Sequence, residues 1–286
     1  MSTLYVSDLD GTLLNRNTEL SERSKEIINT LVKQGVKFTY ATARSFSSAS
    51  KLLQGLNLSI PAITYNGAYF VEPTDGKIIY STSFSYEQMK YISTILREHK
   101  AYPLVYSLLE SEERVSWLEG KENAGLLNYL KARKGDKRLR CVTKDEELYL
   151  GSIFYFTVIG EKNELEALKG YFDDKSQFVC TVQQELYGEG EYWLEIMPHN
   201  ATKAMGVKWL KEITGCDKVI CFGDAINDIS MFTVADHAYA VADANLQLKE
   251  ISTGIIGSNN EDGVALWLLE HAVYKGIEVN GVTAYK

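Results

Sequence analysis

Short apolar runs recur along the chain and predict buried strands. Each is rich in β-branched or aromatic residues and lacks alternating polar positions, which is typical of strands covered on both faces of a parallel sheet. Residues 21–34 show a helical pattern, with Ser21 as the predicted N-cap and Gly35 as the stop, and residues 47–56 predict a second helix. Alternating strands and helices indicate an α/β fold: a doubly wound, mostly parallel Rossmann-like core sheet, with ligands beyond the carboxyl ends of its strands. The predicted strands are 3–7, 36–41, 62–65 and 219–222.

The pattern changes after residue 65. Short strands at 69–71 and 77–80 flank a turn that contains Asp75-Gly76, which predicts a β-hairpin. From about residue 84 to 190, helices at 86–99 and 161–172 alternate with separate strands at 102–108, 153–158 and 178–182, and the α/β pattern resumes at Trp193. We therefore expect a discontinuous α/β core, residues 1–83 and 191–286, with an inserted α+β domain of residues 84–190.

Composition narrows the class of protein. The chain has 286 residues, of which 45% are hydrophobic, and 30 basic against 38 acidic residues give a net charge of −8. This balance excludes extensive disorder and disfavours nucleic acid and anionic membranes as partners, since both need a basic face. No apolar stretch of about 18 residues occurs, and the N-terminus lacks the features of a secretory signal, so we expect a cytoplasmic protein.

The four cysteines fit that location. Their spacing and that of the four histidines lack the pairs typical of a structural zinc site, and we expect buried, reduced thiols. The cysteines are Cys141, Cys180, Cys216 and Cys221.

Polar residues follow several predicted strands. Asp8 and Asp10 come directly after the first strand, Thr42 follows the second, and Asp224 and Asp228 follow the strand at 219–222. Taken alone, the first pair could be a solvated acidic turn. Because parallel strands end at the same sheet edge, we expect these side chains to converge, and four carboxylates would repel one another unless a hard cation such as Mg²⁺ shares the site.

The order of these motifs resembles that of the haloacid dehalogenase-like phosphatases. The resemblance rests on Asp8-x-Asp10-Gly11-Thr12, Thr42, Lys203 and Gly223-Asp224-x-x-Asn227-Asp228. Asn66-Gly67-Ala68 and the long insertion narrow it to the Cof-type group with a large α/β cap, subclass IIB. It covers residues 1–83 and 191–286. Ala43 departs from the glycine often found there, and Asn200-Ala201-Thr202 departs from a Gly-Val-Ser type sequence, without removing a functional group.

The resemblance implies a role for each motif residue. Asp8 is implied as the nucleophile that forms an aspartyl-phosphate, and Asp10 as the general acid and base. Mg²⁺ would be held by Asp8, the backbone carbonyl of Asp10, and Asp224, with Asn227 and Asp228 as ligands or supports. Thr42 and Lys203 would hold the phosphoryl oxygens, with Asn66 and Gly67 as further donors, and the inserted domain would be a cap that excludes water and reads the leaving group.

Two further features leave alternatives open. Arg44 and Ser45 follow Thr42 closely enough to contact substrate, but an Arg44 that pairs with a neighbouring acid is an equal alternative. The basic run from Lys131 to Arg140 is favoured as a solvated helix end and loop rather than an anion site.

We therefore predict a Mg²⁺-dependent phosphatase of a small phosphorylated metabolite, a sugar phosphate or a nucleotide-related phosphomonoester. One alternative is a phosphotransferase or phosphomutase that uses the same intermediate. The other is a non-catalytic phospholigand-binding protein, which would not need both a nucleophile and an acid.

Overall fold

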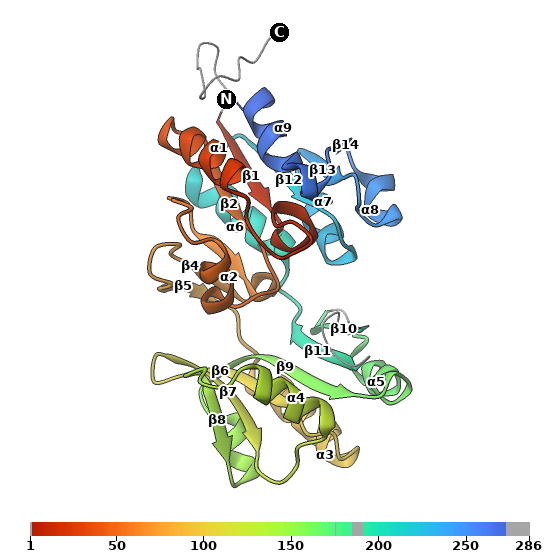
Figure 1. Cartoon of the computed structure of the whole chain (residues 1–286). Coiled ribbons are helices and arrows are strands. Elements are labelled where there is room, and N and C mark those ends of the chain that lie inside the picture. The colour runs from red at the N-terminus through yellow and green to blue at the C-terminus, as the bar shows by residue number, and fades with distance from the viewer. Residues whose placement is uncertain (1, 175, 185–190, 273–286) are drawn as a thin grey trace. The chain divides into compact units, whose positions relative to one another are not determined.

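A computed structural model describes residues 2–174, 176–184 and 191–272 (Figure 1). The chain forms two compact units. The first combines Met1–Tyr80 with Ala201–Lys286, and the second is Ser81–Asn200.

A five-stranded parallel sheet organises the first unit, in the strand order β14-β13-β12-β1-β2. Within it, β1 pairs with β12 on one side and with β2 on the other. Residues 4–7 of β1 are all buried, so both faces of the strand are covered. The strands predicted at 3–7, 36–41 and 219–222 are thereby confirmed. The strands are β1 (Thr3–Ser7), β2 (Lys37–Tyr40), β12 (Lys218–Gly223), β13 (His237–Val241) and β14 (Gly254–Ile256).

Helices cover both faces of this sheet. The crossovers from β1 to β2 and from β12 to β13 run in opposite directions along the sheet, so right-handed connections place their helices on opposite faces. The Ser21 hydroxyl accepts from the Ser24 N–H as predicted, whereas the second helix is shorter than predicted because Gly55 turns the chain at φ +85°. The helices are α1 (Glu22–Lys33), α2 (Phe46–Leu52), α6 (Lys203–Thr214), α7 (Ile229–Phe232), α8 (Leu246–Ile251) and α9 (Gly263–His271).

The strand predicted at 62–65 is real but is not a full member of the parallel sheet. As β3 (Ala62–Thr64) it pairs antiparallel with β4 (Tyr69–Val71), which is followed by β5 (Ile78–Ser81), while one parallel bridge joins Ala41 to Ile63. Tyr65 and Asn66 adopt φ values of +49° and +54°, which reverse the chain just after β3. An apolar run predicts burial but not the direction of its neighbour.

The second unit has a six-stranded, mostly antiparallel sheet in the order β10-β11-β9-β6-β7-β8. Its helices α3 and α5 pack on the sheet through an apolar cluster that includes Ile92, Phe156 and Leu194. The strands are β6 (Leu104–Leu109), β7 (Glu112–Leu118), β8 (Leu139–Val142), β9 (Ser152–Gly160), β10 (Phe178–Gln184) and β11 (Tyr192–Pro198), and the helices are α3 (Tyr86–Glu98), α4 (Ala124–Ala132) and α5 (Lys162–Lys169).

The prediction that the α/β pattern resumes at Trp193 is wrong. Trp193 lies in β11, which pairs antiparallel with both β9 and β10. Its neighbours Leu194 and Ile196 are buried in the cluster of the second unit, which is why this segment resembles a core strand in sequence.

All four cysteines lie among the described residues and are free, but the expectation that they are buried holds only in part. Cys216 and Cys221 are buried, Cys180 is half-buried, and Cys141 is exposed on β8. Within the described ranges, no helix has both the length and the apolar character that a bilayer crossing needs.

Candidate active site

The first strand delivers Asp8 to the carboxyl edge of the sheet. The Asp8 N–H donates to the Phe222 carbonyl at 2.9 Å, so the pairing of β1 with β12 continues one residue past the strand and holds Asp8, which is 5% exposed. The chain then turns at Gly11, whose φ is +75°. A Cβ on Gly11 would lie 2.4 Å from Oδ2 of Asp224, so only glycine permits this approach.

Thr12 completes the link between the two loops. Its hydroxyl donates to Oδ1 of Asp224 at 2.8 Å. The sequence did not predict a role for Thr12. Its position next to Gly11 in the motif was the one signal that it lies at the site.

Three carboxylates meet at this edge. Asp8, Asp224 and Asp228 each offer one oxygen, and these oxygens lie within 4.8 Å of one another. Asp228 is fully buried and its Oδ2 accepts from the N–H groups of Asp224 and Ala225, both at 3.0 Å. These two bonds orient Asp228 from within its own turn.

The pKa values of two of these carboxyls reflect their crowding. Burial raises the pKa of Asp8 well above its usual value, and the charges of Asp228 and Asp224 raise it further, while Lys203 opposes the rise. Burial and the Asp228 charge raise the pKa of Asp224 to about 6. The ionised cluster therefore lacks positive charge, which fits a site for a hard, oxygen-ligated cation.

Lys203 places a positive charge beside two of these carboxylates. It is the first residue of α6, only 1% exposed, and its Nζ donates to Oδ1 of Asp8 at 2.5 Å and to Oδ1 of Asp228 at 2.6 Å. The two carboxylates raise its pKa in spite of burial. They also offset the unfavourable position of an ammonium at a helix N-terminus.

A second loop brings Thr42 to the same edge. The Thr42 N–H donates to the Ile63 carbonyl, and the Thr42 carbonyl accepts from the Asn66 N–H, both at 2.9 Å. The Arg44 N–H donates to the Thr42 hydroxyl oxygen at 3.1 Å, which leaves the hydroxyl proton to bind an acceptor. Asn66 is held at φ +54°, and such strained backbone is concentrated at functional sites.

Gly67 packs this loop against the start of α6. With φ +110°, a Cβ on Gly67 would lie 2.3 Å from the Thr202 carbonyl oxygen. Thr202 is the N-cap of α6, and its hydroxyl accepts from the Met205 N–H. Gly67 therefore sets how closely the loop approaches the helix that carries Lys203.

Arg44 binds Asp10. Its Nε and Nη2 donate to the two carboxylate oxygens of Asp10 at 2.7 and 2.6 Å, and its Nη1 donates to the Ser48 hydroxyl at 3.1 Å. This is the pairing alternative that the sequence left open. The Ser45 hydroxyl accepts from the Ser48 N–H and caps α2, so contact of Arg44 or Ser45 with a substrate stays a prediction.

Asn227 lies at the exposed rim of the site. Its side-chain nitrogen is 3.5 Å from Oδ1 of Asn66, which connects the loop after β12 to the turn after β3.

The basic run of the second unit makes contacts within that unit. Arg138 pairs with Asp136 and Glu113, and the Arg133 guanidinium lies 3.8 Å from the ring centroid of Tyr129.

Known proteins are similar to this chain over almost its whole length. The model of the haloacid dehalogenase-like hydrolase family matches residues 5–268. Two phosphatases of Bacillus subtilis, both named for 5-amino-6-(5-phospho-D-ribitylamino)uracil, are similar: YwtE is 28% identical over 284 residues, covering 91% of this chain and 95% of its own, and YitU is 26% identical over 274 residues, covering 94% and 97%.

Solved structures share the fold. A protein of Thermotoga maritima superposes with a TM-score of 0.74 at 24% identity, covering 96% of this chain and 99% of its own. A sugar phosphatase of haloacid dehalogenase subclass IIB superposes with a TM-score of 0.72 at 20% identity, covering 94% and 98%. The predicted fold class, an α/β unit with a parallel sheet and a separate α+β unit, is confirmed. By the family match, which runs from β1 into α9, the chain belongs to the haloacid dehalogenase-like hydrolases, the family that its sequence motifs predict.

Proposed function

We propose that this hydrolase is a Mg²⁺-dependent, cytoplasmic phosphatase that cleaves a small phosphorylated metabolite through an aspartyl-phosphate on Asp8. The observation that carries the proposal is the buried contact of Asp8 with Lys203, 2.5 Å long, beside two further carboxylates. A carboxylate held in place can act as a nucleophile, and an ammonium next to it can bind the phosphoryl oxygens.

The charge of the cluster supports the metal. Asp8, Asp224 and Asp228 contribute −3 when ionised and Lys203 contributes +1, which leaves −2, the charge that one Mg²⁺ neutralises. These three carboxylates would hold the ion, with the Asp10 carbonyl and Asn227 proposed as further ligands. When bound, Mg²⁺ would neutralise charge that develops on the transferring phosphoryl group.

The residues then have separate tasks. An oxygen of Asp8 forms a bond to phosphorus while the bond from phosphorus to the leaving oxygen breaks. Asp10 donates a proton to that oxygen and later takes one from the water that releases phosphate. Arg44 donates one hydrogen bond to each oxygen of Asp10, and each oxygen keeps a second lone pair at which a proton can be exchanged. Thr42 and Lys203 bind the phosphoryl oxygens.

The substrate class is proposed from the relatives. YwtE and YitU are named for a ribityl phosphate, and a structural neighbour is a sugar phosphatase. A phosphomonoester of a sugar or sugar alcohol is the class that they share. We also propose that the second unit is the cap of this enzyme, with borders near residues 80 and 200.

Replacement of Asp8 by Asn tests the assignment. We expect phosphate release from p-nitrophenyl phosphate with Mg²⁺ to fall by at least about a thousandfold, because the nucleophile is lost. The matched control is Asp173→Asn, which neutralises an exposed carboxylate of the second unit and should leave turnover unchanged. Retained turnover in Asp8→Asn contradicts the mechanism.

Assays of the wild-type protein distinguish the phosphatase from the two alternative functions. Transfer of phosphate to an added sugar instead of water would identify a phosphotransferase. Tight binding without turnover across a panel of phosphorylated metabolites would identify a binding protein.

A further inference from the structure

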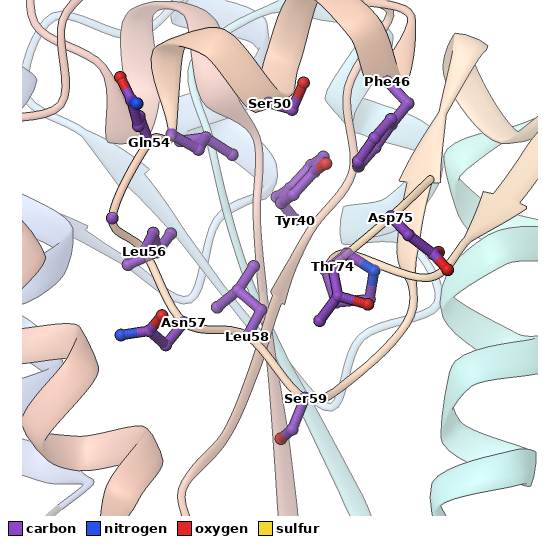
Figure 2. Close-up of a pocket in the computed structure, with 13 residues that line it drawn as sticks. Tyr40, Phe46, Ser50, Gln54, Leu56, Asn57, Leu58, Ser59, Thr74 and Asp75 are labelled. Atoms are coloured by element: carbon purple, nitrogen blue, oxygen red, sulfur yellow. The ribbon is translucent and has the colours of Figure 1, made fainter. Parts of the chain in front are cut away.

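A pocket of about 680 Å³ lies in the first unit, apart from the carboxylate cluster (Figure 2). Its lining comes from the end of β2, from α2, from residues 53–59 and from the turn between β4 and β5. None of the residues that line it is among the predicted catalytic, phosphate-binding or metal residues. The volume is within the range of small-molecule sites, about 300 to 1,000 Å³.

Tyr40 is the polar group buried in this pocket. Its side chain is 2% exposed, and Figure 2 places its ring among the other lining side chains. Within the described ranges its hydroxyl has no hydrogen-bond partner. Burial raises the pKa of the Tyr40 hydroxyl above its usual value, at which tyrosine is already protonated at neutral pH, so the group is a hydrogen-bond donor. A hydroxyl that lines the pocket and has no partner among the described residues is free to donate to a ligand that brings an acceptor.

The remaining lining selects against anions. Asp75 is charged, exposed and acidic, and no lysine, arginine or histidine lines the pocket. Phosphate, which the carboxylate site is proposed to bind, is therefore disfavoured here. Oδ1 of Asp75 accepts from the Lys77 N–H at 2.9 Å, and Oδ2 stays available to a neutral ligand that carries an amino donor.

The walls suit a flat ring. Phe46 and Tyr40 offer aromatic faces, and Leu53 and Leu58 are buried apolar neighbours. Asn57, which is exposed, can exchange hydrogen bonds with polar edges of a ligand. Aromatic and apolar walls with a few polar groups are typical of sites for planar, amphipathic ligands.

From these features we propose that the pocket is a second binding site, for an uncharged nitrogen heterocycle of nucleoside size. Its ring nitrogen accepts a hydrogen bond from the Tyr40 hydroxyl, its amino group donates to Asp75, and its ring packs between Phe46 and the leucine side chains. A phosphorylated form of the same molecule is disfavoured at this site by the charge of Asp75.

Adenosine is the probe, because it is neutral and carries both ring acceptors and an amino donor. Isothermal titration calorimetry of the full chain with adenosine, in the presence of Mg²⁺, should show one binding event. Inorganic phosphate should not displace the bound adenosine. Tyr40→Phe should weaken it about tenfold, the loss of one hydrogen bond to a buried donor. Asp75→Asn should weaken it, because the amide removes the charge while its oxygen can still accept from the Lys77 N–H in the turn. Ser50→Trp should fill the pocket and abolish binding.

The control is Tyr80→Phe, which removes the hydroxyl of an exposed tyrosine outside the lining and should leave the affinity unchanged. Displacement of adenosine by phosphate would assign it to the carboxylate site and overturn the proposal. Absence of binding at millimolar adenosine, or equal affinity in Asp75→Asn, Tyr40→Phe and wild type, would overturn it as well.

Discussion

The contact between Gly67 and Thr202 predicts that one added methyl group displaces Lys203. In Gly67→Ala the new Cβ would start 2.3 Å from the Thr202 carbonyl oxygen, whereas ordinary contacts begin at 3.4 Å. The loop and the start of α6 must therefore separate by about 1 Å. Since a 1 Å misplacement of a reacting group can cost about a hundredfold in rate, we expect kcat to fall by roughly that factor.

Gly35→Ala is the matched control. Gly35 has a similar φ of +95°, so alanine is strained there too, but nothing lies within 4 Å of its added Cβ. Hydrolysis of p-nitrophenyl phosphate with Mg²⁺ gives kcat and KM for both variants, and thermal unfolding compares their strain. Equal kcat values in the two variants would refute the idea that this close approach positions Lys203.

Further predictions concern charge at the site. Lys203→Met leaves Asp8 and Asp228 buried without their ammonium, and we expect the metal-free protein to lose roughly 3 to 5 kcal/mol of unfolding free energy in urea titrations. The pKa of Asp224 is raised from 3.8 to about 6, so the metal-free protein takes up a proton when it folds at a pH between these two values. The free energy of unfolding therefore decreases as pH rises through this range. As pH falls from 7 to 5, the thermal midpoint of the metal-free wild type should therefore rise relative to that of Asp224→Asn. A difference between the two midpoints that does not change with pH would contradict the raised pKa of Asp224. Arg44→Gln should lower kcat about tenfold with little change in thermal midpoint, since the pair is partly exposed, and Arg44→Lys should not restore it because lysine lacks the two-pronged donor; full activity in both would exclude a positioning role.

Sequence patterns predicted the elements of the first unit better than their partners. The apolar runs at β1, β2 and β12 marked real strands because both faces of these strands are buried. β3 and β11 were assigned to the wrong neighbours, since burial is equally compatible with parallel and antiparallel pairing. Direction depends on the turn that follows or precedes a strand, and at β3 that turn uses positive φ values at Tyr65 and Asn66, which few non-glycine residues adopt.

At the site, the sequence indicated which residues would meet but not how they bind one another. Asp8, Asp224 and Lys203 converge because their strand and helix ends share one sheet edge, as motif order predicts. The burial of Lys203 at 1% exposure was not predicted, because a lysine at a helix start is usually solvated. The bond of Thr12 to Asp224 depends on tertiary geometry, which local patterns do not encode.

The pairing of β1 with β12 also has a consequence for synthesis on the ribosome. Residue 3 pairs with residue 218 and residue 7 with residue 222, so the strand that carries the proposed nucleophile emerges long before its neighbour. The six-stranded sheet of residues 81–200 contains all of its partners within one continuous stretch and can form meanwhile. A nascent chain is therefore expected to acquire Mg²⁺ affinity late, only after β12 and the turn that follows it have left the exit tunnel.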